Sequence, residues 1–479
     1  MANERERRIE KNLVEGELSR SIWKLAAPMM IGGLLQDLFS MVDLYFVGEL
    51  GHVEVAALAI AGTVVAILMM LVQGIAVGTM ALIAHFTGEE NHEMSDIVLG
   101  QTLILGIIGS GVMVLVALFL VDPILRLFGA TGDVLIYAGE YLKINFAFAV
   151  SIFIFVGINF ALRGSGDAKT PLYALIIANI LNIILDPMLI MGYGPFPAMG
   201  VAGSAIATVL TRGIGVLFLL RHLLVGHSTL HLKLKYLKPL PPLMKRIISI
   251  GSFASLQVFI REVSFLFLMR LVTSFGHVTL AAYGIGARLR TLVIVPGNGF
   301  AGAAAVLVGQ NLGAGKPKRA QKAAWRTVAY YELILIPIII VFLTFAPGLV
   351  RFFNDHPEVV TIGSSYLHYL ALTFPFLAFS LILGQAMNGA GDTKVPTIVN
   401  AIGQLGFRIP FAYLFALVLK MGYKGIWLGI NASDIVQGIG MILVFSTGRW
   451  RKAFVKHKKK LAREAGFLQA STECSSSGS

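Results

Sequence analysis

Carboxylates inside long apolar stretches are the side chains of this sequence best suited to chemistry. Asp43 lies in the first such stretch and Asp186 in the fifth, with Asn182 one helical turn before Asp186. Ser204 follows in the sixth stretch. A carboxylate within a membrane helix costs about 2.5–3.5 kcal/mol on insertion scales, so it needs a partner or a function. Carboxylate, amide and hydroxyl oxygens suit a hard cation, and two nearby carboxylates could instead share a proton.

Hydrogen bonding between helices is the alternative role for these carboxylates. Asp43 and Asp186 could simply hold the first, fifth and sixth apolar helices together. Asn179, Asn182 and Asp186 are spaced three and four residues apart, so they form one polar stripe on a helix. Because ionisable residues within membrane helices are functional by default, a cation site is the favoured interpretation.

The composition predicts a polytopic membrane protein. Of the 479 residues, 56% are hydrophobic and 14% are charged, and the mean hydropathy is +0.78. Soluble proteins have about 25% charged residues. The N-terminus is charged and polar, so no cleavable signal peptide is predicted. The single cysteine, Cys474, lies in a Ser-rich end that resembles disordered or cloning-derived sequence, so disulfides and cysteine metal sites are excluded.

Twelve apolar stretches predict an all-α membrane protein with twelve transmembrane helices. They cover residues 22–46, 54–84, 97–121, 134–161, 171–193, 199–221, 246–272, 278–308, 323–350, 359–387, 396–420 and 424–447. Lys and Arg cluster in both tails and in the breaks after the sixth and eighth stretches. The positive-inside rule therefore predicts that both termini are cytoplasmic. This distribution accounts for the net charge of +13, so nucleic acid is not an expected partner.

The two halves of the sequence repeat at an offset of 225 residues. The run 51–53 recurs at 276–278, and the Gly-x-Gly-Asp-x-Lys run that begins at Gly164 recurs at Gly389. Each half has six expected spans, so the repeats are parallel, and a pseudo-twofold axis along the membrane normal is expected to relate two six-helix lobes. Two such lobes enclose a cleft that suits alternating access.

The repeat defines the expected domains. They are a cytoplasmic tail (1–20), an N-lobe (21–224), a cytoplasmic linker (225–245), a C-lobe (246–448) and a basic cytoplasmic tail (449–479). The Gly-x-Gly-Asp runs follow no strand and lack the P-loop and Rossmann spacings. They are therefore predicted to be tight turns between helices.

Positions at which the repeats differ are informative, because a shared architecture alone would keep them alike. Asp43 corresponds to Leu268 and Asp186 to Phe411, so both acidic positions belong to the N-lobe alone. This asymmetry favours a functional role for the two carboxylates over a role in packing.

Two further carboxylates recur in both lobes, where Asp37 corresponds to Glu262. Asp37 precedes Asp43 by six residues, about 120° around a helix, so the two side chains point in different directions. We assign Asp37 and Glu262 to the substrate cleft as a hypothesis, with helix packing as an equally weighted alternative.

Several arginines fall inside the expected C-lobe spans: Arg261, Arg270, Arg288, Arg290 and Arg408. Pairing with Glu262 or with backbone carbonyls is the favoured role. The alternative is a cleft wall that contacts anionic groups of a substrate, and for this role we single out Arg261 and Arg408.

Four features of the sequence stand in a particular order and spacing: Pro28 with Asp43 in the first helix, the Val-Asp-x-x-x-Val-Gly-x-Leu-Gly run at 42–51, Asn182 with Asp186, and the Arg-Gly-x-Gly-Asp turn with its echo. Together they resemble the multidrug and toxic compound extrusion (MATE) transporters of prokaryotes, over about residues 15–450. The resemblance implies export of amphipathic, often cationic compounds, driven by influx of Na⁺ or H⁺.

The resemblance also implies roles for individual residues. The family's cation-coupling positions, where Na⁺ would bind, carry over to Asp43, Tyr141, Asn182, Asp186 and Ser204. Asn159 matches a residue that lines the N-lobe pocket, and Pro28 a proline at which the first helix bends. A C-lobe aspartate of one subfamily falls near Leu377 here, so we favour the N-lobe site.

We therefore predict a cation-coupled multidrug antiporter of the plasma or inner membrane. The expected partners are small amphipathic substrates and the lipid bilayer, the expected state is a monomer, and no cofactor is expected beyond the coupling ion, Na⁺ or H⁺. A lipid-linked oligosaccharide flippase of the same superfamily is the alternative, because Arg261 and Arg408 would suit a pyrophosphate. A channel and an enzyme are disfavoured, because the sequence shows no selectivity filter and no nucleophile–base or metal constellation.

Overall fold

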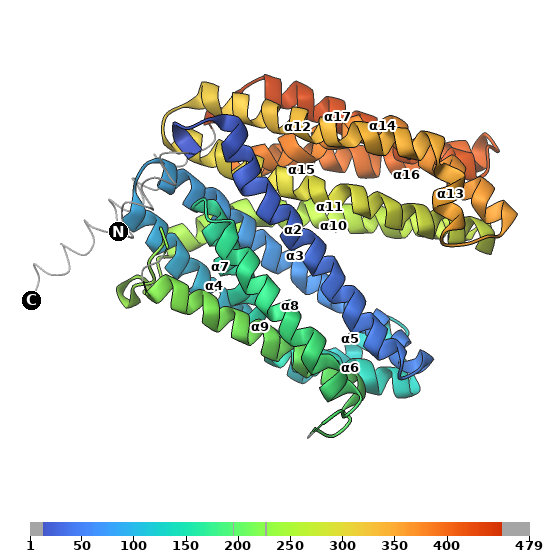
Figure 1. Ribbon diagram of the computed structural model, residues 1–479, viewed down its shortest axis with the longest axis horizontal. Helices are drawn as coiled ribbons and strands as arrows, with labels where there is room; N and C mark the ends of the chain where they lie inside the picture. Colours follow the sequence, from blue (N-terminus) through green and yellow to red (C-terminus); the bar gives the residue numbers. More distant parts are fainter. Residues whose placement is uncertain (1–12, 195, 226–227, 453–479) are drawn as a thin grey trace, which may run out of the picture. The chain divides into compact units, whose positions relative to one another are not determined.

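Helices make up nearly all of the secondary structure in the computed structural model (Figure 1). The structure describes residues 13–194, 196–225 and 228–452, so most of the two charged tails, with Cys474, lies outside the described residues. The helices of the first half are α2 (Leu18–Gly48), α3 (His52–Gly88), α4 (His92–Phe119), α5 (Val121–Leu127), α6 (Gly132–Ala147), α7 (Ala149–Gly164), α8 (Lys169–Ile190), α9 (Gly200–Leu224) and η1 (Leu234–Tyr236). Those of the second half are α10 (Pro241–Thr273), α11 (His277–Gly313), α12 (Pro317–Thr344), α13 (Ala346–Arg351), α14 (Pro357–Gly389), α15 (Lys394–Ala401), η2 (Ile402–Arg408), α16 (Ile409–Tyr413), η3 (Leu414–Val418), α17 (Tyr423–Ser446) and η4 (Arg449–Lys452).

Long apolar helices dominate this arrangement. Within the described residues, 11 helices or helical runs are long and apolar enough to cross a membrane. The pair α6 and α7 passes the same test together, which brings the number of spans to 12 if the pair forms one span. The predicted all-α membrane fold with twelve spans is therefore confirmed.

The fourth expected span, 134–161, is not one straight helix, because α6 and α7 meet at an angle of 55°. Two side chains near the bend donate to nearby backbone carbonyls, one within α6 and one on Phe148, the residue between the two helices. Asn145 Nδ2 lies 3.0 Å from Tyr141 O, and Ser151 Oγ lies 2.9 Å from Phe148 O. Side-chain donors that compete for helical carbonyls in this way are a known cause of helix bending.

The eleventh expected span, 396–420, is also irregular. It begins as the α-helix α15, widens to a π-helix in η2, and widens again in η3. Pro410 lies between the two π-helical segments and cannot donate a helical hydrogen bond. Such wide turns occur frequently at functional sites, and η2 ends on Arg408, one of the arginines singled out above.

The described chain divides into two compact units. Residues Ile31–Ser252 form most of the first unit, whereas Gly16–Met30 and the chain from Phe253 onward form the second. The helices α2 and α10 each begin in one unit and end in the other. In the second unit the Trp23 ring packs edge-on against Phe300, with 5.2 Å between ring centroids. The units therefore exchange the first turns of these helices, which the expected lobe boundaries at 21 and 246 did not anticipate.

The repeated Gly-x-Gly-Asp runs form tight turns, as predicted. Gly166 and Gly391 have φ angles of 95° and 80°, which glycine adopts without the steric cost of a Cβ atom. In the first turn Asp167 Oδ1 accepts hydrogen bonds from the backbone N–H groups of Lys169 and Thr170, both at 3.0 Å. The carboxylate thus satisfies two of the free donors at the start of α8, a structural role that leaves no need for a phosphate.

The linker that follows α9 packs along α4. Gln101 is fully buried, and its amide nitrogen donates to the carbonyls of Tyr236 (3.1 Å) and Lys238 (2.9 Å). Its amide oxygen accepts from Leu240 N at 2.7 Å. His231 N donates to Asp96 Oδ1, also at 2.7 Å. These bonds attach the linker to the first unit, so it does not behave as a free spacer.

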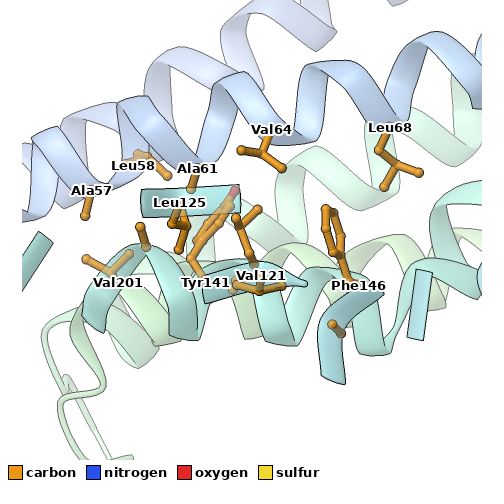
Figure 2. Close-up of a cluster of buried hydrophobic side chains, with 14 of the residues drawn as sticks. Ala57, Leu58, Ala61, Val64, Leu68, Val121, Leu125, Tyr141, Phe146 and Val201 are labelled. Carbon is orange, nitrogen blue, oxygen red and sulfur yellow. The ribbon is translucent and has the colours of Figure 1, made fainter. Parts of the chain in front are cut away.

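A cluster of small and branched apolar side chains forms the core of the first unit around α3. Figure 2 shows the Tyr141 ring of α6 within this cluster, among residues such as Ala61 of α3, Leu125 of α5 and Val201 of α9. The small residues let helices approach closely, which is the main source of packing energy between helices inside a membrane. The cluster holds Tyr141 in a fixed position beside the polar residues described next.

Candidate functional site: a buried acidic group in the first unit

Asp43 and Ser204 are brought together although 161 residues separate them. Ser204 Oγ on α9 donates to Asp43 Oδ1 on α2 at 2.5 Å. Ser204 is fully buried and Asp43 is 8% exposed. The sequence therefore placed these two side chains correctly in one group, and the short contact shows that Asp43 accepts a hydrogen bond here.

The polar stripe of α8 forms the second part of the group. Asn182 Nδ2 donates to Asp186 Oδ1 at 3.0 Å, and both residues are fully buried. One turn earlier, Asn179 Nδ2 donates to the backbone carbonyl of Leu35 on α2 at 2.9 Å. The predicted single face of three polar residues is confirmed, and its first member ties α8 to the helix that carries Asp43.

Electrostatic interactions join the two carboxylates to each other and to two further side chains. Asp43 lies within electrostatic range of Asp186, and Tyr141 lies within range of both. The half-buried Arg212 of α9 interacts with Asp43 and with the Tyr141 hydroxyl. The group thus contains two carboxylates and one guanidinium, so with both carboxylates ionised it would carry one more negative charge than positive charge.

Four oxygen atoms of this region are buried without a hydrogen-bond partner: Asn179 Oδ1, Asn182 Oδ1, Asp186 Oδ2 and Thr208 Oγ1. Buried polar atoms are nearly always paired, so four unpaired oxygens need an explanation. Carboxylate, amide and hydroxyl oxygens are also the ligands that hard cations prefer. The set therefore fits a Na⁺ ion, and the unpaired carboxylate oxygen equally fits a proton.

The register between α8 and α9 supports one site rather than scattered atoms. A Cβ atom at Gly203 would lie 2.3 Å from Leu189 O, and one at Gly215 would lie 3.7 Å from Ala174 O. The two helices therefore run antiparallel, and this register places Thr208 level with Asn182. Among the described residues no group of three or more His, Cys, Asp or Glu side chains could hold a metal ion, so any cation here relies on amide and hydroxyl oxygens as well.

The structure does not bring the remaining candidates into this group. Asp37 is exposed on α2. Asn159 is buried, but its Nδ2 donates within its own helix, to Phe155 O at 2.6 Å. Arg261 and Glu262 are neighbours on α10 that interact with each other at 3.4 Å, and both side chains are exposed on the surface of the protein. Their assignment to a substrate cleft stays a prediction.

The match to a family model is decisive for classification. The MatE model matches the chain twice, over residues 28–188 and 254–414, which together make up more than half of the chain. This chain belongs to the MATE family. The two matched segments cover corresponding parts of the two halves, which agrees with the internal repeat.

Individual relatives agree with this assignment. The probable multidrug resistance protein NorM of Thermotoga maritima is 26% identical over 93% of this chain and 96% of its own length. The FAD transporter of Shewanella oneidensis is 24% identical over 89% of this chain and 94% of its own length. A crystal structure of MATE in the bent conformation superposes with a TM-score of 0.85 at 27% identity, covering 95% of this chain and 99% of that one. The protein is therefore a multi-pass membrane transporter of the MATE fold.

Sequence reasoning missed one buried acid in this MATE transporter, Asp434 of α17. Arg290 of α11 does not pair with Glu262 or a backbone carbonyl, as the favoured role for the arginines would require. Its Nη2 atom lies 3.0 Å and 2.8 Å from the two carboxylate oxygens of Asp434. The signal was available, because Asp434 lies in the middle of the last apolar stretch, where a carboxylate is costly.

Arg212 is a second residue whose role the sequence did not show. The sequence alone assigned no role to it. Its spacing held the clue, since Ser204, Thr208 and Arg212 recur every four residues and therefore share one face of α9.

The close approach of α8 and α9 gives a testable consequence. Gly203→Ala would place a Cβ atom 2.3 Å from the Leu189 carbonyl oxygen, which already accepts a hydrogen bond from Met199 N. Backbone atoms cannot rotate away as a side chain can, so we expect this overpacking to cost about 1–3 kcal/mol of stability. The measurement is the thermal unfolding temperature of the purified protein in detergent.

Gly213→Ala is the matched control on the same helix, because a Cβ atom there would meet nothing within 4 Å. It should leave the unfolding temperature unchanged or raise it, since alanine favours a helix over glycine. If both variants unfold at the same temperature, the close contact between α8 and α9 does not limit stability.

Proposed function

We propose that this MATE transporter is a cation-coupled antiporter that exports small amphipathic compounds. The observation that carries the proposal is the buried acidic group of the first unit, in which Asp43 and Asp186 lie within electrostatic range and buried oxygens lack partners. The names of its relatives, multidrug resistance protein and FAD transporter, favour small organic compounds over a lipid-linked oligosaccharide.

The charge of the group supports coupling to one monovalent cation. When both carboxylates are ionised, they and Arg212 leave one negative charge in buried surroundings, where an uncompensated charge is costly. One Na⁺ or one H⁺ neutralises that charge, and Asn182 and Thr208 offer the additional oxygens that Na⁺ requires. No cofactor beyond this ion belongs to the proposal.

Competition between substrate and cation would produce the exchange. The charged group attracts a cationic substrate, and the attraction falls when one Na⁺ or H⁺ neutralises the net charge of the group. A ligand shifts a conformational equilibrium only through different affinities for the two states. Cation binding would therefore favour the state that releases the substrate on the outer side of the membrane.

The helix α2 is the proposed moving element. Pro28 lies inside α2 and removes one helical hydrogen bond. It also lies close to the point, between Met30 and Ile31, where α2 passes from the second unit to the first. A bend at Pro28 would therefore change how the segment that carries Asp43 is held, and so couple occupation of the cation site to the conformation of the transporter.

The remaining parts of the proposal concern the setting. The protein acts as a monomer in the plasma or inner membrane, with both termini in the cytoplasm. The basic linker residues Lys233, Lys235 and Lys238 support this orientation.

Transport by the purified protein in proteoliposomes tests the proposal. We expect imposed gradients of Na⁺ or of protons to drive ethidium against its own gradient, and an ionophore that collapses the effective gradient to stop it. Liposomes without protein are the control. An ethidium flux that is unchanged by either gradient would contradict cation coupling. An ethidium flux that responds to only one of the two gradients would identify the coupling ion.

A further inference from the structure

The polarity of the first unit is reversed in the second. At the positions that correspond to Asp43 and Asp186, the second unit has Leu268 and Phe411. Its buried charges are instead Arg290, Arg408 and Asp434, whose counterparts in the first half, at 65, 183 and 209, are all apolar. The second unit thus has an excess of buried arginine, at positions different from those of the two carboxylates in the first unit.

Asp434 neutralises one of the two guanidinium groups. Arg290 Nη2 donates to both oxygens of Asp434, at 3.0 Å and 2.8 Å, and Thr373 Oγ1 lies 3.5 Å from the same carboxylate. The second terminal nitrogen of Arg290, Nη1, is buried and has no hydrogen-bond partner. The ion pair therefore leaves the Nη1 amino group of Arg290 without an acceptor.

Arg408 has no carboxylate partner among the described residues. It is 8% exposed, and its Nη1 donates to Gln404 Oε1 at 2.8 Å. Its Nε atom is buried without a partner. A buried guanidinium that lacks a counterion is strongly disfavoured unless another negative group compensates it.

The two arginines and Asp434 lie in one neighbourhood. A Cβ atom at Gly429 would meet Ala412 N at 2.5 Å, and one at Gly403 would meet Gln437 Cγ at 2.2 Å. This antiparallel register places Arg408 level with Asp434 on α17. The charges of Arg290 and Arg408 also both act on Tyr283 and on Tyr366. The neighbourhood thus has two guanidinium groups and one carboxylate, an excess of one positive charge.

An aromatic surface adjoins Arg408 on the same helical run. The half-buried rings of Phe407 and Phe411 stack with 5.2 Å between their centroids and an interplanar angle of 23°. These two residues occupy the positions that Asn182 and Asp186 hold in the first unit. A cation beside partly open aromatic rings suits a ligand that is both anionic and aromatic.

We propose that Arg408, with Arg290, binds the carboxylate or phosphate group of a small aromatic anion in the second unit. The unpaired Arg408 Nε and Arg290 Nη1 donate to the anionic group, and Phe407 and Phe411 contact its ring. One anion neutralises the excess positive charge. Transport of such an anion across the membrane rests on the proposed transport function. Binding of the anion does not depend on that function.

Binding measurements without any ion gradient test the inference. The probes are 2-naphthoate and 2-naphthyl phosphate, with 2-naphthylmethylammonium as the cation of matching shape. The wild-type protein is placed in phosphatidylcholine nanodiscs, and affinities are measured by calorimetry. We expect both anions to bind, and Arg408→Gln to weaken their binding at least tenfold while the affinity for the cation stays within twofold.

Two variants make the result specific. Arg408→Lys keeps the positive charge and should retain part of the anion affinity, which also guards against a folding defect in Arg408→Gln. Arg351→Gln removes an exposed arginine of α13 in the same unit, to which no role in binding is assigned, and should leave anion binding unchanged. Failure of gradient-driven efflux would not alter these affinities, so the two proposals can fail separately.

Three outcomes would overturn the inference. In the first outcome, neither aromatic anion binds to the wild-type protein. In the second, both anions bind equally well to the wild-type protein and to Arg408→Gln. In the third outcome, phosphatidylglycerol added to the nanodiscs displaces the anions from the wild-type protein and is itself retained only when Arg408 is present, which would identify a lipid headgroup as the ligand.

Discussion

Asp43→Asn and Asp186→Asn should each reduce gradient-driven efflux to the level of protein-free liposomes. Each substitution preserves the size of the side chain and removes one negative charge. With Arg212 still present, the acidic group would then be neutral and would have no need of a cation. The coupling ion and a cationic substrate would both lose their main electrostatic attraction, so transport is expected to stop.

The rate of ethidium efflux from proteoliposomes, with Na⁺ and proton gradients imposed separately, measures this effect. The unfolding temperature of each variant shows whether the protein still folds. Asp122→Asn is the matched control, because Asp122 is an exposed carboxylate that pairs with Lys143 at 2.9 Å on the surface of the same unit. Wild-type rates in either Asp43→Asn or Asp186→Asn would reject coupling through that residue.

The same variants also test competition. In the wild-type protein, the affinity for ethidium should fall as Na⁺ rises or as the pH falls. Linkage requires the substrate to weaken cation binding by the same factor. Both dependences should disappear in the Asp43→Asn variant, and an ethidium affinity that stays flat in the wild-type protein would leave Asp43 with a structural role only.

Asp434→Ala is expected to be the most destabilising single change in the second unit. It would leave Arg290 buried without its carboxylate, next to Arg408, which has no carboxylate partner in the described chain. Breaking a buried ion pair by removing one partner costs about 3–5 kcal/mol. The loss should appear as a large drop in the unfolding temperature, or as a shorter half-life of the folded protein in detergent at a fixed temperature.

The double variant Arg290→Met/Asp434→Leu separates the cost of an unpaired charge from the loss of shape. Replacing both members of a buried pair by apolar residues is often neutral or stabilising by about 1–4 kcal/mol. The double variant should therefore be more stable than Asp434→Ala.

An exposed ion pair provides the matched comparison. Lys143 and Asp122 are each about half exposed, so Asp122→Ala should cost no more than about 1 kcal/mol. Equal stability of Asp434→Ala and Asp122→Ala would show that the buried pair does not stabilise the second unit.

Much of the acidic group could be predicted because its signals are local in the sequence. Asn182 and Asp186 are one turn apart, so their common helix face follows from helix geometry alone. The link to Asp43 was available from a comparison of the repeats, since neither carboxylate has an acidic counterpart in the second half. The contact between Asp43 and Ser204 required the additional estimate that both lie at a similar depth in the membrane.

The buried pair of the second unit could not be predicted in the same way. Arg290 had several polar residues within the neighbouring spans as candidate partners, and hydropathy does not distinguish among them. Its partner Asp434 lies 144 residues away. The carboxylate that pairs with Arg290 depends on how α11 and α17 are rotated about their own axes, and this rotation cannot be predicted from hydropathy or residue order.

By itself, the sequence determined the number of apolar spans, the internal repeat and the places where the repeat fails. Hydropathy and residue order are enough for these, because a membrane requires each span to be long and apolar whatever its neighbours are. The tertiary structure alone decided the bend between α6 and α7, the exchange of the first turns of α2 and α10, and the partners of Arg212, Arg290 and Arg408. These features depend on side chains of different helices meeting at one depth and one orientation, which is settled only when the helices pack together.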